Sequence, residues 1–371
     1  MTPQPTPHGP TDLVISGLGL VLPCGDGIEA ARASLAAGRP CFAELPEALG
    51  PGRGAACTAF NPTGIIPPIQ LRRLDRACRY AWGAAHQAFL DAGLEPRSLG
   101  DRIAVAVGTQ SGGSEASEAF MRPYLLRGPE GASPLIFPNT VANAASGHLA
   151  LAFGLKGPSA TFVDRENATF GALEQACRWL HLGLVDAALV VGTDGLFPLL
   201  LDLCGRAGFL ARHGDPVVGA GTGFLPGEGA QAFLVETRAA AAARGIRPRA
   251  TLAGLAGRSA AGDGREDRAE ALAASAESLI VASPQRRIGG GNGRPNLDVA
   301  EARLAARQPQ WPAALHPKQL WGEFAGSGGQ LLAAALLEAS PQVLITAPAS
   351  AGTQFAVLLE EVSGRYGIIS D

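Results

Sequence analysis

The chain alternates short apolar runs with segments whose apolar residues recur at helical spacing. In its first part, the pattern predicts buried strands at Leu13–Gly19, Arg102–Gly108, Val185–Gly192 and Phe233–Glu236. Helices are predicted at Leu71–Leu90, between Val163 and Val185, where Leu173, Ala176, Leu180 and Leu184 share one face, and from Glu236 to Gly245. Apolar strands that alternate with amphipathic helices are typical of a largely parallel sheet covered on both faces. We therefore predict an α/β fold.

The same alternation starts again near Ile246. It predicts strands at Ala250–Leu255, Gln342–Ala347 and Phe355–Val362, helices at Arg265–Ser278, Asp298–Ala306 and Gly328–Ala339, and a glycine-rich loop at Gly289–Gly293. The polar residues 257–264 are expected to form a loop. Residues 1–10 are rich in proline and polar side chains and are expected to be a disordered lead-in. The predicted division is therefore residues 1–10, a half at 11–245 and a half at 246–371.

Composition narrows the classes of function. Of the 371 residues, 47% are hydrophobic and 17% are charged, and the net charge of −3 provides no basic surface for nucleic acid or for a membrane. No apolar run approaches the roughly 20 residues that span a bilayer. The six cysteines occur singly, at no metal-binding spacing, which is typical of buried residues in a reducing cytoplasm. The glycine-rich loop fits no nucleotide-binding motif, so we expect neither a metal nor a cofactor.

Several motifs, in the same order along nearly the whole chain, resemble those of β-ketoacyl synthases. The segment Gly157–Phe170 is similar to the turn that carries the nucleophilic cysteine in that family. The further matching segments are Val14–Leu20, Phe60–Thr63, Phe137–Asn143, Gly147–Ser159, Gly208–Leu210 and Gly223–Ala230. The resemblance implies a thiolase-like α/β fold, in which two similar halves stack as five αβαβα layers and which is usually dimeric.

The same resemblance implies that the catalytic positions are degenerate. The position of the cysteine is occupied by Asn167, and those of the two histidines by Gly290 and Glu323, whereas the lysine is retained as Lys318. An amide lacks the ionisable thiol that forms an acyl-enzyme. Asn167 is expected to cap the following helix, or alternatively to hydrogen-bond an acyl carbonyl. Lys318 and Glu323 are expected to form an internal ion pair, and the alternative for Glu323 is a general base.

Two further comparisons with the family motifs concern the rest of the site. The resemblance places Ser350 where ketosynthases have a phenylalanine that gates the acyl pocket, so the gate and the nearby oxyanion donors are altered as well. The histidines of this chain, His8, His86, His148, His181, His213 and His316, all fall outside the catalytic positions. His148, at the start of a matched helix, is expected to be structural.

Retained scaffold motifs without the chemical groups imply a chain length factor, the ketosynthase-like subunit of type II polyketide synthases that lacks the cysteine. Such a subunit forms a heterodimer with a catalytic ketosynthase, and acyl carrier protein binds to that complex. Its side chains pack at the end of the acyl tunnel and close it. Ile136, Phe137, Phe209 and Ser350 are the expected interface or tunnel residues, with ordinary core packing as the alternative for the first two. Because aromatic pathways usually have Gln at the cysteine position, Asn167 favours a polyene pathway.

Two other classes of function stay open. One is an enzyme that uses the fold differently, as an acyltransferase, a hydrolase or a malonyl decarboxylase. It would need a nucleophile, and Thr169 and Ser327 are the hydroxyls close to the site in sequence. The other is a homodimeric protein that binds acyl chains without reaction.

Overall fold

The computed structural model describes residues 13–362, except residues 263, 281, 282, 325, 327, 339 and 351. The strands are β1 (Leu13–Leu22), β2 (Gly25–Asp26), β3 (Ala43–Glu44), β4 (Arg53–Gly54), β5 (Ile103–Gly108), β6 (Ser159–Phe162), β7 (Ala187–Asp194), β8 (Gly229–Thr237), β9 (Ala250–Ser259), β10 (Arg286–Gly289), β11 (Ala314–Leu315), β12 (Gln342–Ala347) and β13 (Thr353–Glu360). The lead-in predicted for residues 1–10 lies outside the described residues, and the division after residue 245 stays a prediction.

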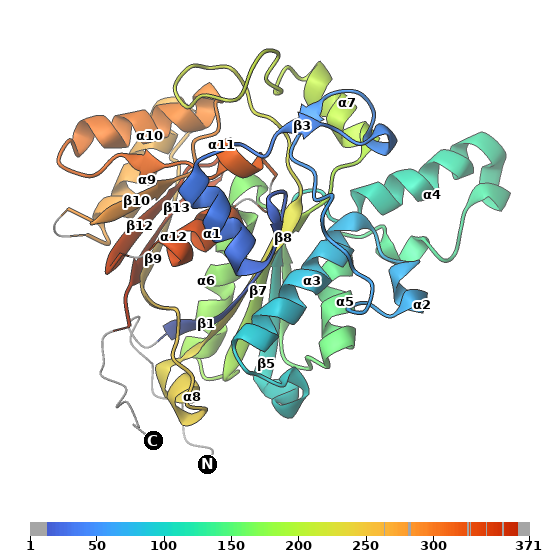
Figure 1. Ribbon diagram of the computed structural model, residues 1–371, viewed down its shortest axis with the longest axis horizontal. Coiled ribbons are helices and arrows are strands. Elements are labelled where there is room, and N and C mark those ends of the chain that lie inside the picture. The colour runs from blue at the N-terminus through green and yellow to red at the C-terminus, as the bar shows by residue number, and fades with distance from the viewer. Residues whose placement is uncertain are drawn as a thin grey trace.

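The helices alternate with these strands along the chain (Figure 1). They are α1 (Gly27–Ala37), α2 (Pro68–Leu71), α3 (Arg76–Asp91), α4 (Ser114–Arg127), α5 (Ala144–Phe153), α6 (Ala168–His181), α7 (Pro198–Arg206), α8 (Arg238–Ala243), α9 (Arg265–Glu277), α10 (Pro295–Arg307), α11 (Lys318–Trp321) and α12 (Gly328–Leu337). Within the described ranges, no helix is both long enough and apolar enough to cross a membrane.

The large sheet is mixed, which corrects the prediction of a largely parallel one. Its strand order is β11-β10-β12-β13-β9-β1-β8-β7-β5-β6. Strand β5 is parallel to β6 and β7, and β10 is parallel to β11 and β12, but the pairs β7–β8, β8–β1, β1–β9, β9–β13 and β13–β12 are antiparallel. The alternation of strands and helices does not fix strand direction, because β12 and β13 are joined by a short loop and β8 enters the sheet after the long segment 207–228.

Five layers follow from the way the helices cover this sheet. Helices α6 and α12 lie at the centre, and their apolar residues form one core with strands from both ends of the sheet. Helices α3 and α5 pack on the outer face of β5, β7 and β8, whereas α9 and α10 pack on the outer face of β12 and β13. This arrangement places the start of α6 in the middle of the molecule, within reach of loops from both parts of the chain.

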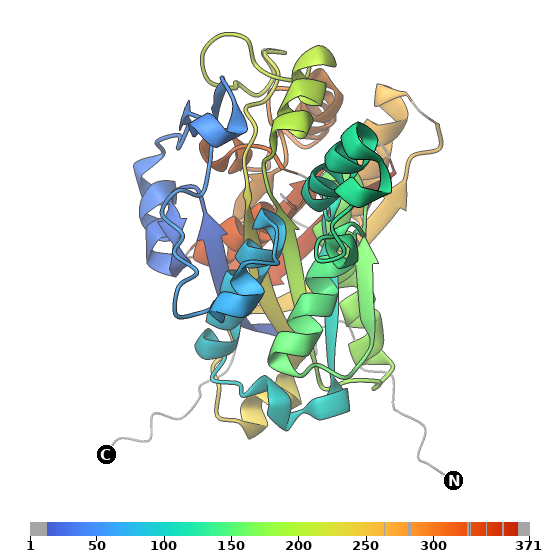
Figure 2. The ribbon, with the colours of Figure 1, turned by 90° about the vertical axis from the view of Figure 1, so that its right-hand side faces the viewer.

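Local signals explain most differences from the predicted boundaries. Helix α3 begins later than predicted because the Asp75 carboxylate accepts a hydrogen bond from the Cys78 amide and caps it. Helix α10 begins earlier, at Pro295, a residue well suited to the first turn. The expected loop at 257–264 is wrong in part, because β9 continues to Ser259 and pairs with β13. Helices α1, α4 and α7 were not predicted. Helix α4 projects from the body, and Figure 2 shows α4 and α5 on the side that faces the viewer.

Candidate functional site

The turn between β6 and α6 is strained. Arg165 has a φ of 48°, the one positive φ found at a non-glycine residue in the described part of the chain. Its amide donates a hydrogen bond to Oε1 of Gln110 at 3.1 Å, which supports this conformation from the loop after β5. A side chain in the left-handed region costs free energy and persists where the surroundings enforce it, often at functional sites. The following residues, Glu166 and Asn167, are both buried.

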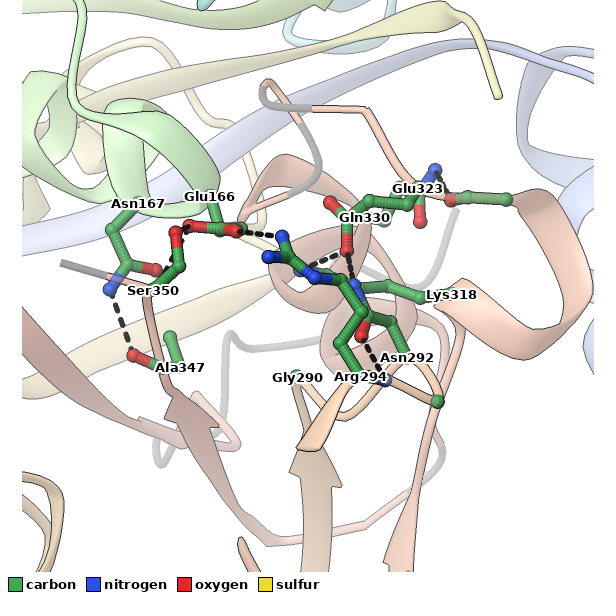
Figure 3. Close-up of polar contacts among 12 residues, drawn as sticks. Glu166, Asn167, Gly290, Asn292, Arg294, Lys318, Glu323, Gln330, Ala347 and Ser350 are labelled. Carbon is green, nitrogen blue, oxygen red and sulfur yellow. Dashed lines mark hydrogen bonds and ion pairs between the residues drawn. The ribbon is translucent and has the colours of Figure 1, made fainter. Parts of the chain in front are cut away.

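Asn167 occupies the N-cap position of α6, but its side chain makes no capping hydrogen bond, so this part of the expectation is wrong. Its Nδ2 instead donates to the carbonyl oxygen of Ala347 at 2.8 Å (Figure 3). It also donates to the carbonyl oxygen of Thr353 at 2.8 Å. These carbonyls lie at the end of β12 and the start of β13, where the ladder between the two strands begins. A primary amide has two N–H groups and satisfies both carbonyls. Asn167 therefore joins α6 to the second part of the sheet.

Glu166, which sequence reasoning missed, lies between two loops. Its Oε2 accepts hydrogen bonds from the amide and the hydroxyl of Ser350, at 3.1 and 3.0 Å. Its Oε1 lies 3.8 Å from Nη1 of Arg294, the residue that precedes α10 (Figure 3). The Arg294 guanidinium in turn lies 4.1 Å from the ring centroid of Phe209. A cation over an aromatic face is stabilised electrostatically, so Glu166 and Phe209 both help to hold Arg294 in place.

Lys318 and Glu323 form the ion pair expected from the sequence. Nζ of Lys318 lies 3.0 Å from Oε2 of Glu323, and both side chains are buried. The same oxygen accepts a hydrogen bond of 2.5 Å from Nδ2 of Asn292 (Figure 3). A buried charge is tolerated when it is paired and hydrogen-bonded. The contacts with the ammonium and the amide therefore account for the burial of Glu323.

Gly290 is enclosed by its surroundings. Its amide donates to the Thr346 carbonyl and to Oε1 of Glu301, both at 3.0 Å. A Cβ added at this position would lie 2.8 Å from Cδ of Pro348, which is closer than carbon atoms approach without a shift. A histidine at position 290 would therefore require Pro348 or the backbone to move.

A third buried carboxylate, that of Asp194, also lines the site. Asp194, at the end of β7, accepts hydrogen bonds from the hydroxyls of Thr109 and Ser111 and from the amides of Ser111 and Gly326. Its burial raises the pKa of this carboxyl, while the hydrogen bonds oppose the shift. Asp194 thus ties the loops after β5 and β7 to the segment before α12. A carboxylate at the end of a buried strand was the sequence signal that could have identified it.

These loops enclose a cavity of about 220 Å³. Its apolar wall comes from α7 and the neighbouring segments, with Leu196, Leu200, Leu201, Phe224 and Phe324, and its charged wall includes Glu166, Arg294 and Glu323. The structure thus brings the predicted residues Phe209, Ser350 and Glu323 to one cavity. Asn167, Gly290 and Lys318 are not among the residues that line it.

The remaining predicted residues lie away from the cavity or use their polar groups in structural hydrogen bonds. Ile136 and Phe137 lie in the segment that follows α4, where Phe137 packs against Phe120 with ring centroids 5.5 Å apart. The Thr169 hydroxyl is buried and donates to the Gly326 carbonyl, and Ser327 lies outside the described residues. His148 is structural, as expected, because Nε2 contacts Oδ1 of Asn139 at 2.7 Å, and burial lowers its pKa.

Comparison with known proteins places this geometry in a family. The family model described as "Beta-ketoacyl synthase, N-terminal domain" matches residues 11–241. The chain is 30% identical, over 88% of its length and 85% of the relative, to the tetracenomycin polyketide synthase ketoacyl synthase beta subunit of Streptomyces glaucescens. It is 29% identical to 3-oxoacyl-[acyl-carrier-protein] synthase 2 of a Synechocystis species, over 66% of this chain and 62% of that protein.

A solved structure titled "The ishigamide ketosynthase/chain length factor" superposes with a TM-score of 0.85 at 22% identity, covering 95% of this chain and 100% of the other. This likeness confirms the thiolase-like α/β fold expected from the sequence motifs.

Proposed function

This chain belongs to the β-ketoacyl synthase family and is similar to the β subunit of a polyketide synthase, and we propose its function from this premise. We propose that it is a chain-length-factor-type subunit of a type II polyketide synthase, without condensing activity of its own. The proposal rests on the contacts of the Asn167 side chain. The amide at the nucleophile position is bonded to two backbone carbonyls and is absent from the cavity wall. It has neither the chemistry nor the position to receive an acyl group.

The residues at the positions that would assist a nucleophile make structural contacts as well. The Glu323 carboxylate contacts an ammonium and an amide, and Gly290 contributes no side chain to the cavity. Thr169, the hydroxyl closest to Asn167 in sequence, donates to a backbone carbonyl. General acid or base chemistry needs a group within hydrogen-bonding reach of the substrate and free to exchange a proton. These contacts favour a scaffolding role over an altered transferase, hydrolase or decarboxylase.

The proposed partner is a catalytic ketosynthase of the same fold. The face formed by α4, the segment after it and α5 exposes Leu125, Leu126, Leu135, Phe137, Val141 and Leu151. Strand β6 lies at the edge of the large sheet beside this face. Exposed apolar side chains gathered on one face indicate a surface that is covered in the assembly. We propose that Ile136 and Phe137 contact the ketosynthase there, and that an acyl carrier protein delivers substrate to the pair.

In this arrangement the partner supplies the cysteine, and this chain limits the length of the product by steric packing. A tunnel wall discriminates chain lengths because each added methylene needs free volume that a close-packed interior lacks. Phe209 and Ser350 line the cavity of this chain. We propose them as residues that keep this second, non-reactive cavity closed while the partner's pocket elongates the chain.

Native mass spectrometry of the chain co-expressed with a catalytic ketosynthase from the same organism tests the proposal. A 1:1 heterodimer that Phe137→Asp weakens is the expected result. A stable homodimer that ignores the ketosynthase would overturn it. Release of CO2 from malonyl carrier protein by the isolated chain would also overturn it, in favour of an altered enzyme.

A further inference from the structure

The long segment between α7 and β8 forms one wall of a groove that lies next to the cavity described above. This outer groove has a volume of about 500 Å³ and shares Phe209 and Arg294 with the cavity. Residues of the segments 207–213 and 221–223 line it, together with Arg265, the first residue of α9, and residues 294–296 at the start of α10. Parts of the chain that are far apart in sequence therefore border one space.

Backbone hydrogen bonds fix the loop that follows Phe209. The Gly219 amide donates to Oδ2 of Asp298 at 2.8 Å, and the Gly223 amide donates to the Gly293 carbonyl at 3.1 Å. Both contacts join the loop to residues at or just before the start of α10. The shape of the outer groove is thus set by contacts within the chain.

The outer groove is rich in cationic side chains. Arg212, Arg265 and Arg294 line it together with His213, and within the described residues no aspartate or glutamate lines it. In that same part of the chain, neither Arg212 nor Arg265 forms an ion pair. The net charge of the whole protein is −3, so positive charge is concentrated here on a protein that is negative overall. A cleft lined by one sign of charge raises the local concentration of ions of the opposite sign.

Two of the three guanidinium groups are held in place. The contacts with Glu166 and the Phe209 ring hold Arg294, and Nε of Arg265 donates to Oδ1 of Asn296 at 2.9 Å. Because a guanidinium only donates, Asn296 presents its oxygen to Arg265, and its amino group remains a further donor at the groove. Donors that are positioned in advance lose less conformational entropy when a ligand binds.

We propose that the outer groove is a binding site for a small polyvalent phosphate anion of the diphosphate class. Guanidinium groups present parallel N–H donors that match the oxygens of a phosphate group. Arg212, Arg265 and Arg294 contact the anion, and the amino group of Asn296 donates to one of its oxygens. Three guanidinium groups around one space favour an anion with several negative charges over a monovalent carboxylate.

Isothermal titration calorimetry of the purified full chain with sodium pyrophosphate, without divalent cations and at constant ionic strength, tests this site. Saturable 1:1 binding is expected, and R212A/R265A should weaken it by about tenfold or more. The matched control R39A/R127A removes two exposed arginines that do not line the groove, so its affinity should equal that of the wild type. Circular dichroism verifies that both double variants are folded.

Absence of saturable pyrophosphate binding to the wild type would overturn the proposal. Equal losses of affinity in R212A/R265A and R39A/R127A would overturn it as well, because the anion would then respond to net charge and not to the groove. Sodium acetate should bind at least about tenfold more weakly than pyrophosphate, and equal affinities would contradict the assigned class of ligand. The test involves no condensing partner, so its failure leaves the proposed function unaffected.

Discussion

The Lys318 ammonium and the Glu323 carboxylate form a buried ion pair, 3.0 Å apart, where the family resemblance places a lysine and a histidine. We expect Glu323→Gln to lower the free energy of unfolding by about 3–5 kcal/mol, because it leaves the buried Lys318 charge uncompensated. Urea denaturation measures this loss. The double variant K318M/E323M should regain most of it, since neither charge is then buried.

The exposed pair Arg206–Asp202 provides the control for this prediction. Asp202→Ala should change stability by no more than about 0.5 kcal/mol, because exposed pairs between helix neighbours contribute little. Equal losses for Glu323→Gln and Asp202→Ala would show that the buried pair is not a structural requirement.

Asn167 is predicted to be structural. Asn167→Ala should cost about 1–3 kcal/mol, because the Ala347 and Thr353 carbonyls lose the donor that now lies 2.8 Å from each. Asn167→Asp has nearly the same shape but places a carboxylate oxygen against a carbonyl oxygen, so it should cost more than Asn167→Ala. Thermal and urea unfolding of the two variants measure the order. An Asp variant as stable as the wild type would disprove the donor role.

Asn167→Cys alone is predicted not to form carbon–carbon bonds. The new thiol would face the carbonyls that now bind the amide, and positions 290 and 323 would still lack imidazole groups. Adding Gly290→His is also expected to fail, because its Cβ would lie 2.8 Å from Cδ of Pro348. Mass spectrometry of the carrier-protein-bound product, with the catalytic partner as positive control, checks both variants. A condensation product from Asn167→Cys by itself would contradict the degenerate-site interpretation.

Contacts within short stretches were predictable from the sequence, and contacts between distant loops were not. The strands around Val14 and Val190 follow from their continuous apolar runs, and the Lys318–Glu323 pair follows from a five-residue spacing. The partners of Asn167 lie 180 and 186 residues further along the chain, and Ser350 lies 184 residues from Glu166. No local pattern encodes which carbonyls a side chain meets across such separations, so the cap expected at Asn167 was wrong.

The direction of the strands could not be predicted from the hydrophobic pattern either. A continuous apolar run indicates a strand buried on both faces, and in this sheet the parallel and the antiparallel strands are both buried in this way. Family motifs identified positions 167, 290 and 323 but gave no information about Glu166 or Arg294. Their roles depend on which loops close over the cavity, and this is decided by packing in three dimensions.

Phe137 is predicted to belong to the interface with the ketosynthase. Its side chain is 60% exposed, and an acidic residue there would place a charge within an apolar contact. Phe137→Asp should weaken the heterodimer by about tenfold or more, whereas the isolated chain should stay folded and lose only the ring contact with Phe120. Leu182→Asp, at a side chain 58% exposed after α6, is the matched control and should leave affinity unchanged. Titration by mass photometry compares them, and equal affinities for both variants would remove Phe137 from the interface.

Arg294 is predicted to close the cavity. It lies in the wall shared by the inner cavity and an outer groove of about 500 Å³, which is also lined by Phe209, Arg212 and Arg265. Its contacts with Glu166 and the Phe209 ring hold the guanidinium in this wall. Removing the side chain in Arg294→Ala should join the two spaces. We therefore expect it to increase the binding of an apolar fluorescent probe such as a dansylated fatty acid by several fold.

The controls separate opening of the wall from a general loss of charge. Arg212→Ala removes a guanidinium that lines the outer groove but not the cavity, so it should leave probe binding near the wild-type level. Glu166→Gln keeps an acceptor for Ser350 but loses the charge that attracts Arg294, and it should bind the probe more tightly than the wild type. Fluorescence titration gives the three affinities. If Arg294→Ala and Arg212→Ala bind the probe alike, Arg294 does not separate the two spaces, and the closure of this cavity must depend on the loop that carries Ser350.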